Sequence, residues 1–220
     1  IRSALRKEKP DVLWFMTDPR FYEWLWQMED EIRSLVPMVY YHVWDNFPAP
    51  VYNKVWYDST DTIACISKVT EAVVREVVPN HKDICYLPHT VDTQIFKKIE
   101  DEKELEERRR EGFTILDNVN ERTVFFWNNR NARRKQSGSL IYWFKKFLDD
   151  VGHDKATLLM HTDPKDPHGQ DLEYIINHLE LNKGQVYLSR AKVEPQYLSV
   201  MYNICDCTIS ISDAEGFGLA

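Results

Sequence analysis

The chain has 220 residues, of which 43% are hydrophobic and 29% charged, a balance that suits one large globular domain or two modest ones. Its 28 basic and 35 acidic residues give a formal net charge of −7, so we expect no nucleic-acid partner. The sequence has no apolar run long enough to span a bilayer and does not start with a signal-peptide pattern.

The four cysteines lack the spacing of a zinc site, and this usage favours a reducing, cytoplasmic compartment. Cys205 and Cys207 alternate along an apolar segment of strand length, which predicts that both thiols are buried on one face. His161, His168 and His178 are not grouped with other ligands at metal-like spacing, so we interpret them as structural and expect no metal.

The first half of the sequence alternates between strand-like and helical segments. The predicted strands are 11–16, 37–42, 62–67 and 83–87, and the predicted helices are 21–33 and 68–78. Such alternation is typical of a parallel sheet with helices on its faces. These folds usually open on a strand and a glycine-bearing loop, which the first residues lack, so we expect this domain to be incomplete at its N-terminus.

His42 lies at the predicted carboxyl end of the second of these strands, and Asp45 follows it. Ligands of open α/β sheets bind beyond that edge, which makes both residues candidates for a site. A histidine at a strand end is also a common structural group, and the residues alone leave both interpretations open.

A charged connector follows, from residue 98 to residue 120. Glu104 and Arg108 stand four residues apart in the favourable order, as do Glu106 and Arg110, which predicts a short solvated helix. Because the arginines are interleaved with glutamates, we favour a surface helix over a phosphate-binding patch.

The second half predicts another α/β domain. The predicted strands are 123–127, 156–161, 185–189 and 205–211, and the predicted helices lie near 140–148, 171–179 and 194–203. A basic loop, Asn128-Asn-Arg130-Asn-Ala-Arg-Arg-Lys135, joins the first of these strands to the first of these helices. Arginine offers a planar fork and lysine a point charge, and both stabilise a departing nucleotide phosphate. A plain basic loop would look the same, so this too stays open.

The chain ends on Ser212-Asp-Ala-Glu215-Gly-Phe-Gly-Leu-Ala220. After a strand, this segment predicts a tight glycine turn that opens a helix, whose unpaired N–H groups favour an anion. The carboxylate of Glu215 is suited to accept hydrogen bonds from sugar hydroxyls. An ordinary strand–helix turn is the alternative.

The order and spacing of these segments resemble family 4 of the retaining glycosyltransferases with the GT-B fold. The resemblance rests on Glu-Gly-Phe-Gly at 215–218, on the basic loop, and on Pro88-His-Thr-Val-Asp92 with Phe96, which is similar to the interdomain signature of that family. Thr90 and Asn129 stand where the family usually has glycine, and no catalytic role is carried over to His89.

This resemblance implies two Rossmann-like domains facing a cleft. The first, at 1–97, would be an acceptor-side domain incomplete at its N-terminus. The second, at 121–220, would bind the donor and be incomplete at its C-terminus, with the connector 98–120 between them. The implied activity is transfer of a sugar from a nucleotide-diphosphate sugar to an acceptor hydroxyl with retained configuration, without a cofactor or a metal.

The resemblance also implies roles for individual residues. Arg130 and Lys135 match residues that bind the donor diphosphate, whereas Arg133 and Arg134 match no motif position. Glu215 and His42 match residues at the donor sugar, and backbone N–H groups of Gly216, Phe217 and Gly218 would add electrostatic support. The loop 190–193 would meet the nucleobase. A second glutamate of the motif would stand at position 223, so we expect the parent protein to continue.

The acceptor, whether glycan, lipid or small molecule, and peripheral contact with a membrane stay open. Two other functions remain as alternatives: another GT-B-like enzyme, such as a nucleotide-sugar epimerase or a phosphorylase, and a nucleotide-sugar-binding module without turnover.

Overall fold

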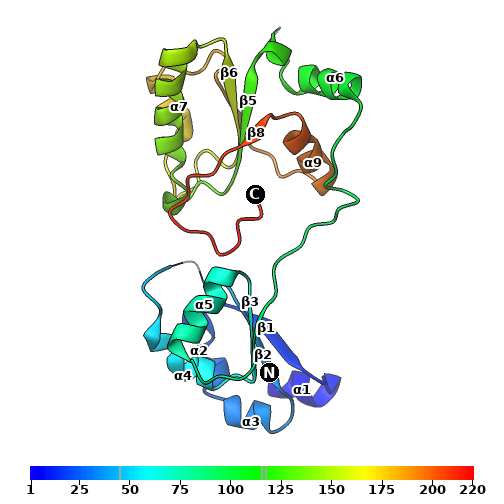
Figure 1. Cartoon of the computed structure of the whole chain (residues 1–220), viewed down its shortest axis with the longest axis vertical. Coiled ribbons are helices and arrows are strands. Elements are labelled where there is room, and N and C mark those ends of the chain that lie inside the picture. The colour runs from blue at the N-terminus through cyan, green and yellow to red at the C-terminus, as the bar shows by residue number, and fades with distance from the viewer. Residues whose placement is uncertain (45, 115, 117) are drawn as a thin grey trace. The chain divides into compact units, whose positions relative to one another are not determined.

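The computed structural model describes residues 1–44, 46–114, 116 and 118–220 (Figure 1). The chain divides into two compact units. The first unit comprises Ile1–Thr90 and Ala214–Leu219, and the second comprises Val91–Asp213 and Ala220. Each unit contains a four-stranded parallel sheet with helices, so the α/β class predicted from the sequence is confirmed.

The sheet of the first unit has the strand order β1-β2-β3-β4. Its strands are Leu13–Met16 (β1), Met38–His42 (β2), Thr62–Cys65 (β3) and Ile84–Tyr86 (β4). All the pairings are parallel, with Met16 beside Tyr41 and His42 beside Cys65. The carboxyl ends of these strands therefore meet at one edge of the sheet, and His42 lies on it.

The helices described in this unit are Arg2–Glu8 (α1), Pro19–Trp26 (α2), Glu29–Arg33 (α3), Lys54–Asp58 (α4) and Lys68–Val77 (α5), with the 3₁₀ turn Val51–Asn53 (η1) before α4. The predicted helix 21–33 is divided in two, because the chain leaves the helical conformation at Met28 (φ −109°, ψ 12°). The start of α5 is capped by Ser67, whose hydroxyl accepts from the Thr70 N–H at 3.0 Å.

The sheet of the second unit has the strand order β7-β6-β5-β8. Its strands are Thr123–Asn128 (β5), Ala156–His161 (β6), Val186–Ser189 (β7) and Cys207–Thr208 (β8). The predicted strand 205–211 is thus reduced to two residues, since its recorded pairing reaches only from Phe125 to Phe126 on β5. Cys207 is exposed and Cys205 half-buried, so the expected burial of both thiols is wrong for Cys207.

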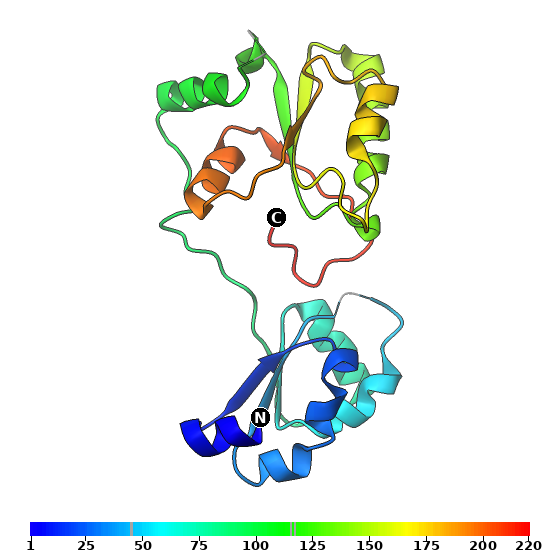
Figure 2. The ribbon, with the colours of Figure 1, turned by 180° about the vertical axis from the view of Figure 1, so that it is seen from behind.

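Helices cover both faces of this sheet (Figures 1 and 2). They are Glu102–Gly112 (α6), Ser137–Val151 (α7), Leu172–His178 (α8) and Pro195–Asn203 (α9), with the 3₁₀ turns Val119–Glu121 (η2) and Arg133–Lys135 (η3). The side chains of successive β5 residues point to opposite faces of the sheet, as they do in any β-strand. Trp127 packs with α7 and α8, whereas Phe126 packs with Phe113, which follows α6, and Ile204, which follows α9. None of the helices in the described part of the chain is both long and apolar enough to span a membrane.

The connector after the first sheet is anchored to α9. Ser199 Oγ donates to the Ile95 carbonyl oxygen at 2.8 Å, and Asn203 accepts from the Ile99 N–H at 2.8 Å. The connector predicted at 98–120 is therefore part of the second unit, which begins at Val91. The predicted solvated helix is α6, where Arg108 donates to Glu104 at 2.9 Å.

The predicted helix after the glycine turn is not formed. Residues 209–220 adopt neither helix nor strand, and that expectation was wrong.

Candidate functional site

The basic loop lies at the carboxyl end of β5. Residues 129–136 pass through η3 to Gln136, which has a left-handed conformation (φ 56°), and enter α7 directly. Because β5 and β6 are parallel, their carboxyl ends lie at the same edge, where ligands of open α/β sheets bind. Arg130 and Lys135 are therefore at the edge of the second sheet that suits a ligand.

Arg130 is held by the loop that follows β6. Its Nε and Nη2 atoms donate to the two carboxylate oxygens of Asp166 at 2.6 and 3.2 Å. The Arg130 side chain remains 61% exposed, whereas the Asp166 side chain is only 10% exposed. The hydrogen bonds with Asp166 raise the pKa of Arg130, and those with Arg130 hold the pKa of Asp166 well below its usual range.

His168 adds a second acceptor for the same guanidinium. Its Nδ1 atom lies 2.8 Å from Nη2 of Arg130 and 3.2 Å from Oδ1 of Asp166. A guanidinium can only donate, so Nδ1 accepts from Arg130 and carries no hydrogen for the carboxylate. The longer distance is then a contact and not a hydrogen bond.

Buried amide contacts join the two loops. Asn131 is fully buried, and its Nδ2 atom donates to the carbonyl oxygens of Gln170 at 2.7 Å and Pro164 at 3.4 Å. Its Oδ1 atom accepts from Ser137 Oγ at 2.6 Å. Gly169 passes so closely that a Cβ there would lie 2.0 Å from the Asn131 carbonyl oxygen. The loop carrying Asp166 is thereby fixed against the loop carrying Arg130.

Lys135 and the start of α7 are more enclosed than Arg130. Lys135 is only 7% exposed. The Gly138 N–H donates to Gln170 Oε1 at 3.0 Å, so a side chain already satisfies one of the donors at the N-terminus of α7.

The segment before the glycine motif also contacts the basic loop. Gln136 Nε2 lies 3.0 Å from each carboxylate oxygen of Asp213, and the Asp213 N–H donates to the Arg134 carbonyl oxygen at 2.8 Å. These contacts fix the chain immediately before Glu215 to the loop that carries Arg130 and Lys135.

Residues 214–219, with Glu215, are part of the first unit. Phe217 is 40% exposed and meets His89 edge to face, with ring centroids 5.7 Å apart. A Cβ at Gly216 would lie 2.5 Å from Cγ1 of Val43, and Gly218 has a φ of 79°. A close approach and a positive φ, and not a helix start, therefore require glycine at these two positions.

His42 is fully buried at the carboxyl end of β2. Its Nε2 atom lies 2.7 Å from Tyr57 Oη, which also accepts from Asn53 Nδ2 at 3.2 Å. Burial lowers the pKa of His42 to about 3, so the imidazole is neutral at pH 7. Its Nδ1 atom is buried without a hydrogen-bond partner among the described residues. Asp45, the other candidate at this strand end, lies outside the described residues.

Sequence reasoning missed Asp166, His168, Gln136 and Asp213 as site residues. The available signal was the segment Asp163-Pro-Lys-Asp166-Pro-His168-Gly169, which directly follows a strand at the ligand-binding edge. Among the residues that the structure describes, no group of three or more His, Cys, Asp or Glu side chains could hold a metal ion.

The loop 190–193, which we expect to meet the nucleobase, begins at a cluster of three charged side chains. Arg190 pairs with Glu173 of α8, and Glu173 also pairs with Lys165 at 3.0 Å. A pocket of about 460 Å³ lies beside Arg190, between α8 and β7, with Asn177 and Asn182 in its wall.

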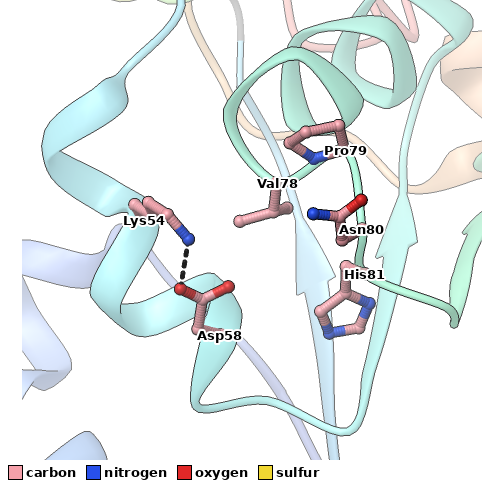
Figure 3. Close-up of a pocket in the computed structure, with 6 residues that line it drawn as sticks. All are labelled: Lys54, Asp58, Val78, Pro79, Asn80 and His81. Atoms are coloured by element: carbon pink, nitrogen blue, oxygen red, sulfur yellow. Dashed lines mark hydrogen bonds and ion pairs between the residues drawn. The ribbon is translucent and has the colours of Figure 1, made fainter.

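The first unit has a pocket of about 270 Å³ away from His42 (Figure 3). It is lined by Lys54, Asp58, Val78, Pro79, Asn80 and His81. These residues precede β3 and β4, so the pocket lies at the amino ends of the strands, opposite the edge with His42. Its charged residues, Lys54 and Asp58, pair with each other at 2.5 Å, and we assign it no function.

Comparison with known proteins shows the fold. No protein-family model and no curated protein sequence matches the chain. Among solved structures, the N-terminal domain of trehalose-6-phosphate phosphatase from Candida albicans superposes with a TM-score of 0.72 at 15% identity, covering 98% of this chain and 53% of that one. HepE from Anabaena, in complex with UDP and glucose, has a TM-score of 0.69 at 13% identity, covering 96% of this chain and 55% of that one.

A trehalose-6-phosphate synthase from Burkholderia multivorans has a TM-score of 0.69 at 11% identity, covering 95% of this chain and 52% of that one. The chain thus spans about half the length of the solved structures it matches. The two parallel four-stranded sheets of the chain, with their helices, match the GT-B fold of these neighbours.

Proposed function

We propose that the chain is part of a retaining glycosyltransferase that moves a sugar from a nucleotide-diphosphate sugar to an acceptor hydroxyl. The observation that carries this proposal is the basic loop with Arg130 and Lys135 at the carboxyl edge of the second sheet, in a chain with the GT-B fold. A similar structure, HepE, was solved with UDP and glucose, and we take a UDP-activated hexose as the first donor to test.

The residues divide the work by their chemistry. Arg130 and Lys135 neutralise the charge that develops on the departing diphosphate. Glu215 accepts hydrogen bonds from hydroxyls of the donor sugar, supported by backbone N–H groups of Gly216, Phe217 and Gly218. We assign His42 a supporting role at the donor sugar, with its buried imidazole neutral at pH 7. The cations do the work that a divalent metal ion does in other transferases, so the reaction needs no metal.

Two further parts of the proposal rest on the sequence. All four cysteines are free thiols, which agrees with a cytoplasmic enzyme. The acceptor is a glycan, a lipid or a small molecule, and the residues of the first unit do not select among them.

A second candidate function is nucleotide-sugar binding without turnover. The observation that favours it is the complete burial of His42, which holds the imidazole away from solvent. A GT-B-like epimerase or phosphorylase has no such specific support.

Isothermal titration and a transfer assay distinguish these functions. We expect UDP to bind more tightly than uridine, because the diphosphate meets Arg130 and Lys135. Incubation of a protein containing these residues with UDP-glucose and an acceptor should release UDP, and NMR of the product should reveal retained anomeric configuration. Binding of UDP without release of sugar would favour the binding module, and an inverted product would exclude the retaining assignment.

A further inference from the structure

We infer that Asp166 is a positioning residue that orients Arg130 toward the diphosphate of the donor, an inference that rests on the proposed function. Asp166 engages Nε and Nη2 of the guanidinium at 2.6 and 3.2 Å. Among the described residues, Nη1 of Arg130 has no hydrogen-bond partner, so its two N–H groups remain as donors for an anion. The carboxylate of Asp166 thus holds the edge formed by Nε and Nη2, and the N–H groups of Nη1 are left for the ligand.

The turn that carries Asp166 is held by several hydrogen bonds. Its carboxylate accepts from the His168 N–H at 2.8 Å, and its carbonyl oxygen accepts from the Gly169 N–H at 2.9 Å. The His168 carbonyl oxygen accepts from the Arg133 N–H at 3.2 Å, which ties the turn to the basic loop. An arginine side chain has many rotamers in water, and holding one of them before the ligand arrives removes an entropy cost from binding.

An ordinary surface ion pair is the competing interpretation, and such pairs contribute little. The Lys145–Asp149 pair on α7 is of that kind, with both side chains about one-third exposed. Asp166 differs because its side chain is only 10% exposed and comes from a different loop, 36 residues along the chain. Asp149 therefore provides a matched control for loss of a carboxylate.

A double-mutant cycle tests the inference. UDP and uridine are titrated into the wild-type chain, Asp166→Asn, Arg130→Ala and the double variant, with melting temperatures measured in parallel. We expect Asp166→Asn to weaken UDP binding about five- to tenfold while uridine affinity stays unchanged, and to have no further effect once Arg130 is alanine. Asp149→Asn should leave UDP affinity unchanged.

His168→Ala gives a second readout if Asp166→Asn fails to fold. His168 is exposed, and this variant removes only the acceptor at Nη2, so UDP binding should weaken about two- to threefold. Unchanged or tighter UDP binding by the variants that fold would overturn the positioning role, as would equal losses for UDP and uridine or additive effects in the double variant. If the wild-type chain does not bind UDP, or if Arg130→Ala leaves UDP affinity unchanged, the proposed function fails as well.

Discussion

Nε2 of His42 lies 2.7 Å from Oη of Tyr57, and both side chains are fully buried beneath the carboxyl edge of the first sheet. The rings of Tyr40 and Trp44 lie 4.8 and 6.0 Å from the imidazole, centroid to centroid. The Tyr57 hydroxyl forms a hydrogen bond with a neutral imidazole in an aromatic environment. A charged ring would lose its hydration there without gaining a counter-ion at hydrogen-bond distance among the residues that the structure describes.

Protonation of His42 should therefore reduce the free energy of unfolding as the pH is lowered. Its pKa is lowered from 6.5 to about 3 by burial, so the unfolded chain binds the proton first. The stabilisation is complete above pH 6.5 and is lost as the pH falls from 6.5 toward 3, at about 1.4 kcal/mol per pH unit. Urea denaturation at pH 7, 6 and 5 should show a shallower decline for His42→Phe than for wild type.

The exposed His178 is the control for that experiment. It stacks on Tyr174 at the surface, so His178→Asn should keep the wild-type slope. Equal slopes for wild type and His42→Phe would mean that His42 is not buried as a neutral ring.

The basic loop gives a prediction about nucleotide binding. Arg130→Ala should weaken UDP binding about tenfold or more, because it removes a charge-assisted contact. Lys135 is buried, so Lys135→Met, which keeps the side-chain volume, is a safer substitution than alanine and should have a similar effect. Calorimetry measures both.

Arg133 is the matched control on the same loop. Its side chain is exposed, and Arg133→Ala should bind UDP like wild type. Loss of affinity in all three variants alike would indicate a general effect of positive charge, and unchanged affinity for Arg130→Ala and Lys135→Met would remove the loop from the site.

Most elements of the fold could be predicted because they rest on local patterns. The run Thr123–Trp127 is apolar at every inner position and forms β5, and the spacing of Leu140, Phe144 and Leu148 is that of the buried face of α7. The division of the predicted helix 21–33 at Met28 could not be predicted, because this segment contains no proline or glycine to signal a break.

The candidate site was only partly predictable. Arg130 and Lys135 could be predicted because they lie in a short run of basic residues between a strand and a helix. Asp166 could not, because its pairing with Arg130 spans 36 residues and depends on two loops meeting at one edge of a sheet.

Glu215 should act on the sugar and not on the nucleotide. Glu215→Gln keeps the size of the side chain but removes the charge that strengthens its acceptance of sugar hydroxyls. We expect sugar transfer from UDP-glucose to collapse while UDP alone binds as in wild type. A parallel loss of UDP affinity and transfer would place Glu215 at the diphosphate end of the donor.

Transfer activity should survive chelation. In the proposed mechanism cationic side chains stabilise the leaving diphosphate, so EDTA should leave the initial rate unchanged. The assay follows UDP release with and without EDTA, and then with added magnesium or manganese. A rate that EDTA abolishes and the metal restores would contradict the roles given to Arg130 and Lys135.

Gly169→Ala should damage both the fold and the nucleotide site. A Cβ at this position would lie 2.0 Å from the backbone oxygen of Asn131 and 2.4 Å from its Oδ1 atom, and neither the backbone nor a fully buried amide can move aside easily. We expect a loss of about 1–3 kcal/mol in the free energy of unfolding. Because the same turn carries Asp166, UDP binding should weaken as well, which calorimetry would detect.

Gly112→Ala is the matched control, since its new Cβ would meet only the terminal Cδ1 atom of Ile204 at 3.0 Å. A flexible side-chain end can shift by a few tenths of an ångström, and alanine favours a helix, so this variant should be nearly as stable as wild type and bind UDP equally well. If Gly169→Ala were as stable as Gly112→Ala and kept wild-type UDP affinity, the β6–α8 loop would not be packed on Asn131. Asp166 would then have no fixed base from which to hold Arg130.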